Sequence, residues 1–178
     1  MARYVAFLRA INVGGHTVKM EALRALFTEL GLEGVSTFIA SGNVNFETRA
    51  RDVAALERKI ETHLEKALGY EVVTFIRSTA ELASVAAHDP FPGRTGPAVY
   101  VAFLKNAPGQ EEQARLMSYR SADDDFQVQG REIYWLPGGR MSDSKFSGAV
   151  LEKAIRMPAT MRNMTTVRKL AALHPATK

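Results

Sequence analysis

The 178-residue sequence contains no cysteine. This excludes disulfides, thiolate zinc sites, iron–sulfur clusters and a cysteine nucleophile. The four histidines are scattered and show no HExxH spacing, so no metal site is expected. No run approaches the roughly 20 apolar residues of a membrane helix, and strand-like residues follow Met1 without a signal-peptide pattern. We therefore expect a cytoplasmic protein with no cofactor and no membrane partner.

The sequence is rich enough in apolar residues to form a core, with 46% hydrophobic and 24% charged residues. This composition is typical of a globular protein rather than a disordered one. The net charge of +4 is uneven, because residues 140–178 hold eight basic residues against two acidic ones. This basic segment favours either an anionic partner or a solvated helical surface.

Hydrophobic spacing predicts the order β-α-β-β-α-β-α in the first half of the chain. Asp52 is expected to cap one helix at its start and Gly69 to end it, while Ser78 and Glu81 match a capping box. The expected segments are strand 3–9, helix 20–30, strands 35–39 and 43–47, helix 53–68, strand 72–76 and a helix from Thr79 toward Asp89.

The second half repeats this order. Its expected segments are strand 99–104, a helix entered near Asn106 and Pro108, strands 126–129 and 132–136, helix 144–156, an extended piece at 160–162 and a helix capped near Thr165. The chain is therefore interpreted as a duplication of an α+β unit. The order β-α-β-β-α-β is ferredoxin-like, so the fold class predicted is two ferredoxin-like repeats, at 1–90 and 91–178, each followed by an extra helix.

Several expected strands carry apolar side chains on both faces. In the first strand, Tyr4, Ala6 and Leu8 alternate with Val5 and Phe7. Since an exposed sheet face would be polar, both faces are expected to be covered. We therefore predict that the two repeats are packed as one folding unit.

Four polar or glycine-rich islands interrupt the periodic pattern. They are Arg-Ala-Ile-Asn-Val-Gly-Gly at 9–15, Ser-Gly-Asn-Val at 41–44, Ser-Lys-Phe at 144–146 and Thr-Met-Arg-Asn-Met-Thr-Thr-Val-Arg-Lys-Leu at 160–170. In this order they resemble the bacterial domain-of-unknown-function family numbered 1697, over nearly the whole chain. The resemblance implies an α+β fold of two related ferredoxin-like halves, and it implies no established activity.

The same islands supply the candidate binding residues. Gly14 and Gly15 follow a strand and precede a helix, so their backbone N–H groups are placed to meet an anion. Arg9 and Arg162 offer bidentate forks and Lys145 a point charge. The remaining candidates, Asn12, Ser41, Gly42, Asn43 and Asn163, would orient polar groups. The alternative for all of them is structural, as turns, caps and bracing between the repeats.

These residues favour binding of a small phosphorylated or carboxylated ligand at the junction of the repeats. Whether the protein is also an enzyme, and which oligomer it forms, stays open. One alternative is RNA binding, because RNA-recognition modules share this element order, although Asn43, Asn45 and Glu47 stand where such modules place aromatics. Another is a non-enzymatic protein-interaction module. The run Asp123-Asp124-Asp125 is interpreted as a solvated turn rather than a cation site.

Overall fold

The structure is a computed structural model that describes residues 1–39, 42–94 and 98–176. The chain forms two compact units. The first is Met1–Ser84 together with the segment that begins at Leu170, and the second is Val85–Lys169. Within the described ranges no helix is both long and apolar enough to cross a membrane.

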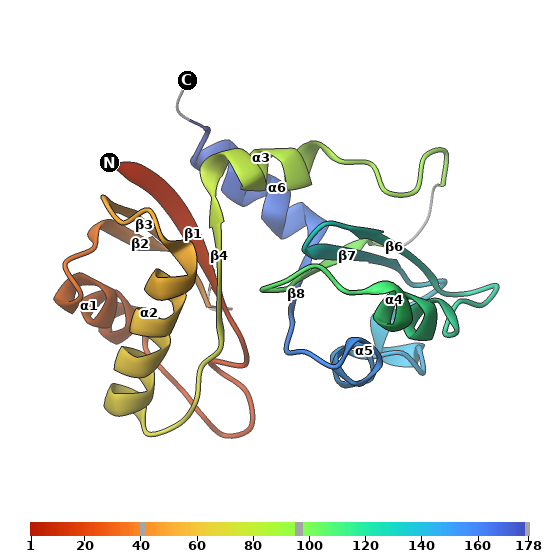
Figure 1. Ribbon diagram of the computed structural model, residues 1–178, viewed down its shortest axis with the longest axis horizontal. Coiled ribbons are helices and arrows are strands. Elements are labelled where there is room, and N and C mark those ends of the chain that lie inside the picture. Colours follow the sequence, from red (N-terminus) through yellow and green to blue (C-terminus); the bar gives the residue numbers. More distant parts are fainter. Residues whose placement is uncertain (40–41, 95–97, 177–178) are drawn as a thin grey trace. The chain divides into compact units, whose positions relative to one another are not determined.

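The first unit contains a four-stranded antiparallel sheet with the strand order β2-β3-β1-β4 (Figure 1). Helices α1 and α2 connect its strands in the ferredoxin-like manner, and α3 follows β4 directly. The bounds are β1 Ala2–Leu8, α1 Met20–Glu29, β2 Glu33–Thr37, β3 Asn43–Thr48, α2 Val53–Leu68, β4 Thr74–Ser78 and α3 Thr79–Ala87.

The second unit has the same kind of sheet, with the order β6-β7-β5-β8. Its bounds are β5 Tyr100–Phe103, α4 Gln110–Met117, β6 Asp125–Gln129, β7 Glu132–Leu136, a 3-10 turn Met141–Asp143, α5 Gly148–Ile155 and β8 Thr160–Asn163. Helix α6, Met164–Leu173, begins in the second unit, and its residues from Leu170 belong to the first. The matching strand orders and connections confirm the predicted α+β class and the duplicated ferredoxin-like arrangement.

One face of each sheet packs against its own helices. In the first unit, Tyr4, Ala6 and Leu8 belong to a core that α1 and α2 complete with Phe27 and Ile60. In the second unit the equivalent core is aromatic, and its members include Phe126, Trp135 and Phe146 together with Leu116 and Leu151. The opposite sheet faces are also buried, as shown by Val5, Phe7, Val101 and Phe103, which are all fully buried. Both sheet faces are therefore covered, as the sequence predicts.

Two buried arginines occupy equivalent positions in the two sheets. Arg77 pairs with Val5, and Arg162 pairs with Val101. Each guanidinium donates through Nη1 to the carbonyl of the preceding residue, at 2.9 Å in both cases. Their exposed fractions are 0% and 8%. The duplication therefore extends to a polar contact on the side of the sheet opposite the helices.

Three predicted segments were placed wrongly. The strand expected at 35–39 runs from Glu33 to Thr37, and Ile39 has a φ of +49°, which is outside the extended region. The strand expected at 72–76 runs from Thr74 to Ser78, because Thr74 is the first residue that pairs with β1. The helix expected at 144–156 begins only at Gly148, since Ser144 is bonded elsewhere and Ser147 is the residue that accepts the Val150 N–H as N-cap. All three errors lie at element ends, where strand pairing and helix capping decide the boundary.

Candidate functional site

In the first unit, the predicted glycine turn is present and exposed. Gly14 and Gly15 have φ values of +68° and +85°, which glycine adopts readily. Asn12 fixes the loop by accepting the Val18 N–H at 2.8 Å, and the Tyr70 hydroxyl donates to the Ile11 carbonyl at 3.2 Å. These contacts match the structural alternative for Asn12 and the glycines.

The other candidates of the first unit lie where β1 and β3 meet. Asn43 is buried and donates through Nδ2 to the Phe38 carbonyl at 3.0 Å, and its backbone pairs with Phe7. Gly42 has φ +77°, and a side chain there would bring its Cβ to 2.8 Å from Ile11. Arg9 is half-buried, and its backbone N–H donates to Val73 at 2.9 Å. Ser41 lies outside the described residues.

The candidates of the second unit differ in their accessibility. Arg162 is buried and donates to Thr160 Oγ1 at 2.7 Å, while burial lowers the pKa of its guanidinium to about 10. Because this value is still well above neutral, Arg162 keeps its charge. Asn163 caps α6 by accepting the Thr165 N–H at 2.8 Å. Lys145 is the one of these three whose side chain is exposed.

Lys145 lines a cavity of about 760 Å³ that lies wholly within the second unit. Volumes of about 300–1,000 Å³ are typical of small-molecule sites. Three segments form its wall: the turn after α4, the loop after β7 with its 3-10 turn, and α5. Its lining combines cations, carboxylates and an apolar side made by Tyr119, Phe146 and Val150.

The Ser-Lys-Phe island is held against the cavity by Asp124. This carboxylate accepts the Trp135 Nε1–H at 2.9 Å and the Ser144 hydroxyl at 3.0 Å. Ser144 Oγ in turn accepts the Phe146 N–H at 3.0 Å. The Phe146 ring packs on Phe126 and Trp135, with centroid distances of 4.5 and 5.1 Å. These contacts therefore hold Ser144 and Phe146, the two residues on either side of Lys145 in the loop.

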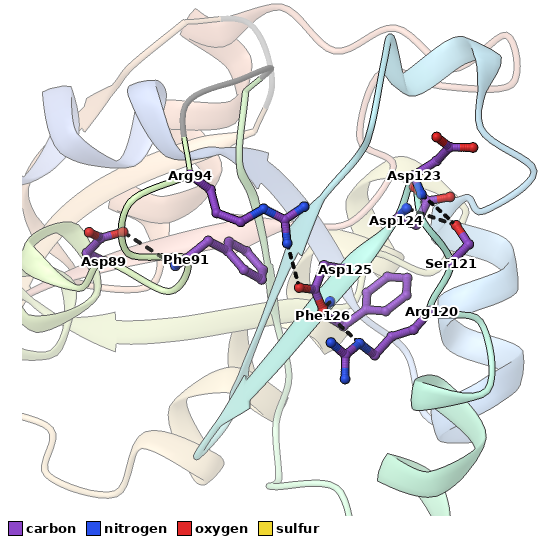
Figure 2. Close-up of polar contacts among 9 residues, drawn as sticks. All are labelled: Asp89, Phe91, Arg94, Arg120, Ser121, Asp123, Asp124, Asp125 and Phe126. Carbon is purple, nitrogen blue, oxygen red and sulfur yellow. Dashed lines mark hydrogen bonds and ion pairs between the residues drawn. The ribbon is translucent and has the colours of Figure 1, made fainter.

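The three consecutive aspartates have separate structural roles (Figure 2). Asp125 forms ion pairs with Arg94 at 2.8 Å and Arg120 at 2.9 Å. The Ser121 hydroxyl accepts the N–H groups of both Asp123 and Asp124, which makes a tight turn before β6. No cluster of metal-binding side chains occurs in the ranges that the structure describes. Asp123 and Asp124 therefore lie in a turn, as the sequence predicts, whereas Asp125 is the first residue of β6, and the carboxylates of Asp124 and Asp125 are bonded to protein groups rather than solvated.

The cavity wall carries unpaired charge of both signs. Across the described part of the chain, the side chains of Arg140, Lys145 and Lys153 have no ion pair, and neither do the carboxylates of Asp123 and Asp143. The Asp124 carboxylate is the exception, because it accepts hydrogen bonds from Trp135 and Ser144. The cations can bind a phosphate or carboxylate, and the two open carboxylates can accept hydrogen bonds from hydroxyl groups.

Residues 1–134 match the family described as "Protein of unknown function (DUF1697)". The chain belongs to this family. Among solved structures it is similar to the conserved bacterial protein SP0830 from Streptococcus pneumoniae, with 26% identity, a TM-score of 0.77 and coverage of 97% of this chain and 98% of that one. No curated protein matches the chain. The comparisons thus support the DUF1697 resemblance and name no activity.

Sequence reasoning missed most of the cavity in this DUF1697 protein. It singled out Ser144, Lys145 and Phe146, and it did not select Arg140, Lys153 or Tyr119, which line the same cavity. One signal was present, because Pro-Gly-Gly-Arg at 137–140 directly precedes the Ser-Lys-Phe island. Tyr119 and Lys153 carry no local signal, since they come from separate segments.

A second, smaller cavity of about 290 Å³ lies in the first unit. Its lining includes Asn45, Arg3, Glu47 and His174. Asn45 is 2% exposed and its Oδ1 has no hydrogen-bond partner in the described residues. Arg3 donates to Glu47 Oε1 from Nη2 at 2.6 Å. Asn43 and Asn45 are both buried, whereas RNA-recognition modules place exposed aromatic side chains on this face of their sheet.

His174 is expected to make the stability of this DUF1697 protein depend on pH. Partial burial lowers the pKa of its imidazole, and the positive charge of Arg3 lowers it further, while Glu47 faces the same cavity. The unfolded chain then binds the proton more tightly than the folded one, so stability falls as the pH drops through about 6.5, the usual histidine value. We expect a smaller loss of stability between pH 7.5 and pH 5 in His174→Gln than in the wild type.

Chemical denaturation at the two pH values measures this difference. An NMR titration of the His174 ring measures the pKa itself, and Arg3→Gln should raise it. A ring pKa at or above the usual value in the wild type would contradict the prediction.

Proposed function

We propose that the protein binds a small phosphorylated or carboxylated ligand in the cavity of its second unit. The observation that carries the proposal is the presence of Arg140, Lys145 and Lys153 on one concave wall, where the described residues supply them with no ion pair. Basic side chains with a purely structural role are normally paired with carboxylates or spread over a surface.

The chemistry of these side chains sets the kind of ligand. Arg140 offers a planar fork that fits two oxygens of a phosphate or carboxylate, while Lys145 and Lys153 act as mobile point charges. All three are exposed, so salt will screen their attraction. We therefore expect an affinity that weakens as ionic strength rises.

Four earlier expectations stay predictions. One is that the repeats at 1–90 and 91–178 are packed as one folding unit. Another is a shared site at their junction, to which all the candidate residues were assigned: Arg9, Asn12, Gly14, Gly15, Ser41, Gly42, Asn43, Lys145, Arg162 and Asn163. The third is a cytoplasmic location, and the fourth is the pair of alternative functions, RNA binding and a protein-interaction module. The proposal concerns binding and includes no reaction.

The test is a panel of phosphates, sugar phosphates, nucleotides and carboxylates measured by thermal shift, followed by calorimetric titration. A ligand at about 100 times its Kd adds roughly 2.7 kcal/mol to the free energy of unfolding. We expect Lys145→Ala and Arg140→Ala each to weaken the binding of an anionic hit about 5- to 10-fold, because each removes one charge-assisted contact.

Lys169→Ala is the matched control, since Lys169 is an exposed lysine of α6 that does not line the cavity. It should leave the affinity unchanged. A panel without any hit, or a hit that binds Lys145→Ala and Arg140→Ala as tightly as the wild type, would overturn the proposal.

A further inference from the structure

An exposed aromatic ring stands on the wall of the same cavity. Tyr119 is 43% exposed, although it lies directly after α4 and is fixed by its N–H bond to the Leu116 carbonyl at 3.0 Å. Its ring contacts Phe146 edge to face, with a centroid distance of 5.9 Å and an interplanar angle of 61°. Phe146 is buried, so it holds the tyrosine in place from one side. Tyr119 is thus a positioned aromatic group with part of its surface open.

The cavity therefore offers three kinds of contact. Arg140, Lys145 and Lys153 suit a phosphate, the open carboxylates of Asp123 and Asp143 suit hydroxyl groups, and Tyr119 suits a planar ring. Inorganic phosphate uses only the first kind, and a sugar phosphate uses the first two. A ligand with a base, a ribose and a phosphate uses all three. The volume of about 760 Å³ is large enough for such a ligand.

We infer that the ligand of the second unit's cavity is a nucleoside monophosphate, with its base stacked on Tyr119 and its phosphate bound by the three cations. This inference rests on the proposed function and narrows its ligand class. The ribose hydroxyls donate to the Asp123 and Asp143 carboxylates, which the described residues leave unpaired. Stacking tolerates any base, because every base presents a π-face. The wall therefore selects nucleotides as a class rather than one base.

Calorimetric titrations compare the four ribonucleoside 5′-monophosphates with ribose 5-phosphate and inorganic phosphate. We expect at least one nucleotide to bind about 10-fold more tightly than ribose 5-phosphate, which corresponds to the stacking of one base. Tyr119→Ala should remove this advantage and leave the affinity for ribose 5-phosphate unchanged. Tyr119→Phe should keep the advantage, because it retains the ring.

Lys145→Ala distinguishes the contribution of the phosphate to the affinity from that of the base. It should weaken the nucleotide and ribose 5-phosphate by the same factor. If ribose 5-phosphate binds as tightly as all four nucleotides, or if Tyr119→Ala weakens both ligands equally, the nucleotide inference is overturned while the proposed anion binding stands. If none of the phosphates binds, the nucleotide inference is overturned, and the proposed anion binding is overturned with it when the carboxylates of the panel also fail to bind.

Discussion

Replacing Asp124 by alanine is expected to lower the free energy of unfolding by about 3 kcal/mol. The substitution leaves the indole N–H of Trp135 without its acceptor, and Trp135 is fully buried. It also releases Ser144, whose hydroxyl is bonded to both carboxylate oxygens at 3.1 and 3.0 Å. A buried donor that loses its partner costs about 1–3 kcal/mol, and a charged acceptor adds to that cost.

Denaturant unfolding of three variants tests this prediction. Asp124→Asn should lower the free energy of unfolding about half as much as Asp124→Ala does, because the amide keeps one carbonyl oxygen for one of the two donors. Asp123→Ala is the matched control, since its carboxylate has no partner in the described residues, and we expect a change within about 0.5 kcal/mol. Equal losses in Asp123→Ala and Asp124→Ala would show that the turn, rather than the Asp124 carboxylate, determines stability.

Gly138→Ala is expected to destabilise the second unit by about 2–3 kcal/mol. A Cβ at this position would overlap the Asp123 carbonyl oxygen and would lie 2.5 Å from the Asp123 Cα. Both atoms are backbone, so no side-chain rotation relieves the contact. The loop after β7 and the turn before β6 would have to separate, and Asp124 would move with that turn. We therefore expect weaker ligand binding together with lower stability.

Gly139→Ala supplies the control for this change. A Cβ at Gly139 has no heavy atom within 4 Å, although the residue lines the same cavity. Its stability should stay within about 0.5 kcal/mol of the wild type. Denaturant unfolding of the two alanine variants measures the difference, and equal stabilities would show that the loop yields to a side chain at Gly138 without cost.

Local signals of the sequence predicted several element ends correctly. Asp52 Oδ1 accepts the Ala55 N–H at 2.9 Å, and Gly69 ends α2 in the left-handed conformation. Ser78 and Glu81 form both bonds of the predicted capping box, at 3.1 and 2.8 Å. These features depend on residues within a few positions of each other, so the sequence alone contains them.

Long-range contacts were the part that the sequence did not predict. The helix expected from Ser144 starts later because Ser144 bonds Asp124, which is 20 residues away along the chain. Arg77 was overlooked although Arg162 was selected, since their equivalence depends on which residues they pair with in β1 and β5. A comparison of Arg77-Ser78 with Arg162-Asn163, each just before a capped helix, would have identified the pair.

In the candidate site, too, the sequence predicted local features and did not predict long-range contacts. The island at 144–146 lines a cavity, and its part in a ligand site stays a prediction. The cavity itself brings together segments near 119–124, 138–146 and 150–153, and only the fold places them on one wall. The glycine island at 9–15 belongs to the first unit and does not line this cavity.

Mapping of the binding surface tests the central claim most directly. In a titration of the isotopically labelled wild type with adenosine 5′-monophosphate, followed by amide chemical shifts, we predict saturable changes concentrated in residues 119–124 and 138–146. The amide resonances of residues 9–16 and 42–43 should not shift. Changes that concentrate instead in the first unit's glycine island would contradict binding in the cavity of the second unit, and no saturable change anywhere would contradict the nucleotide inference.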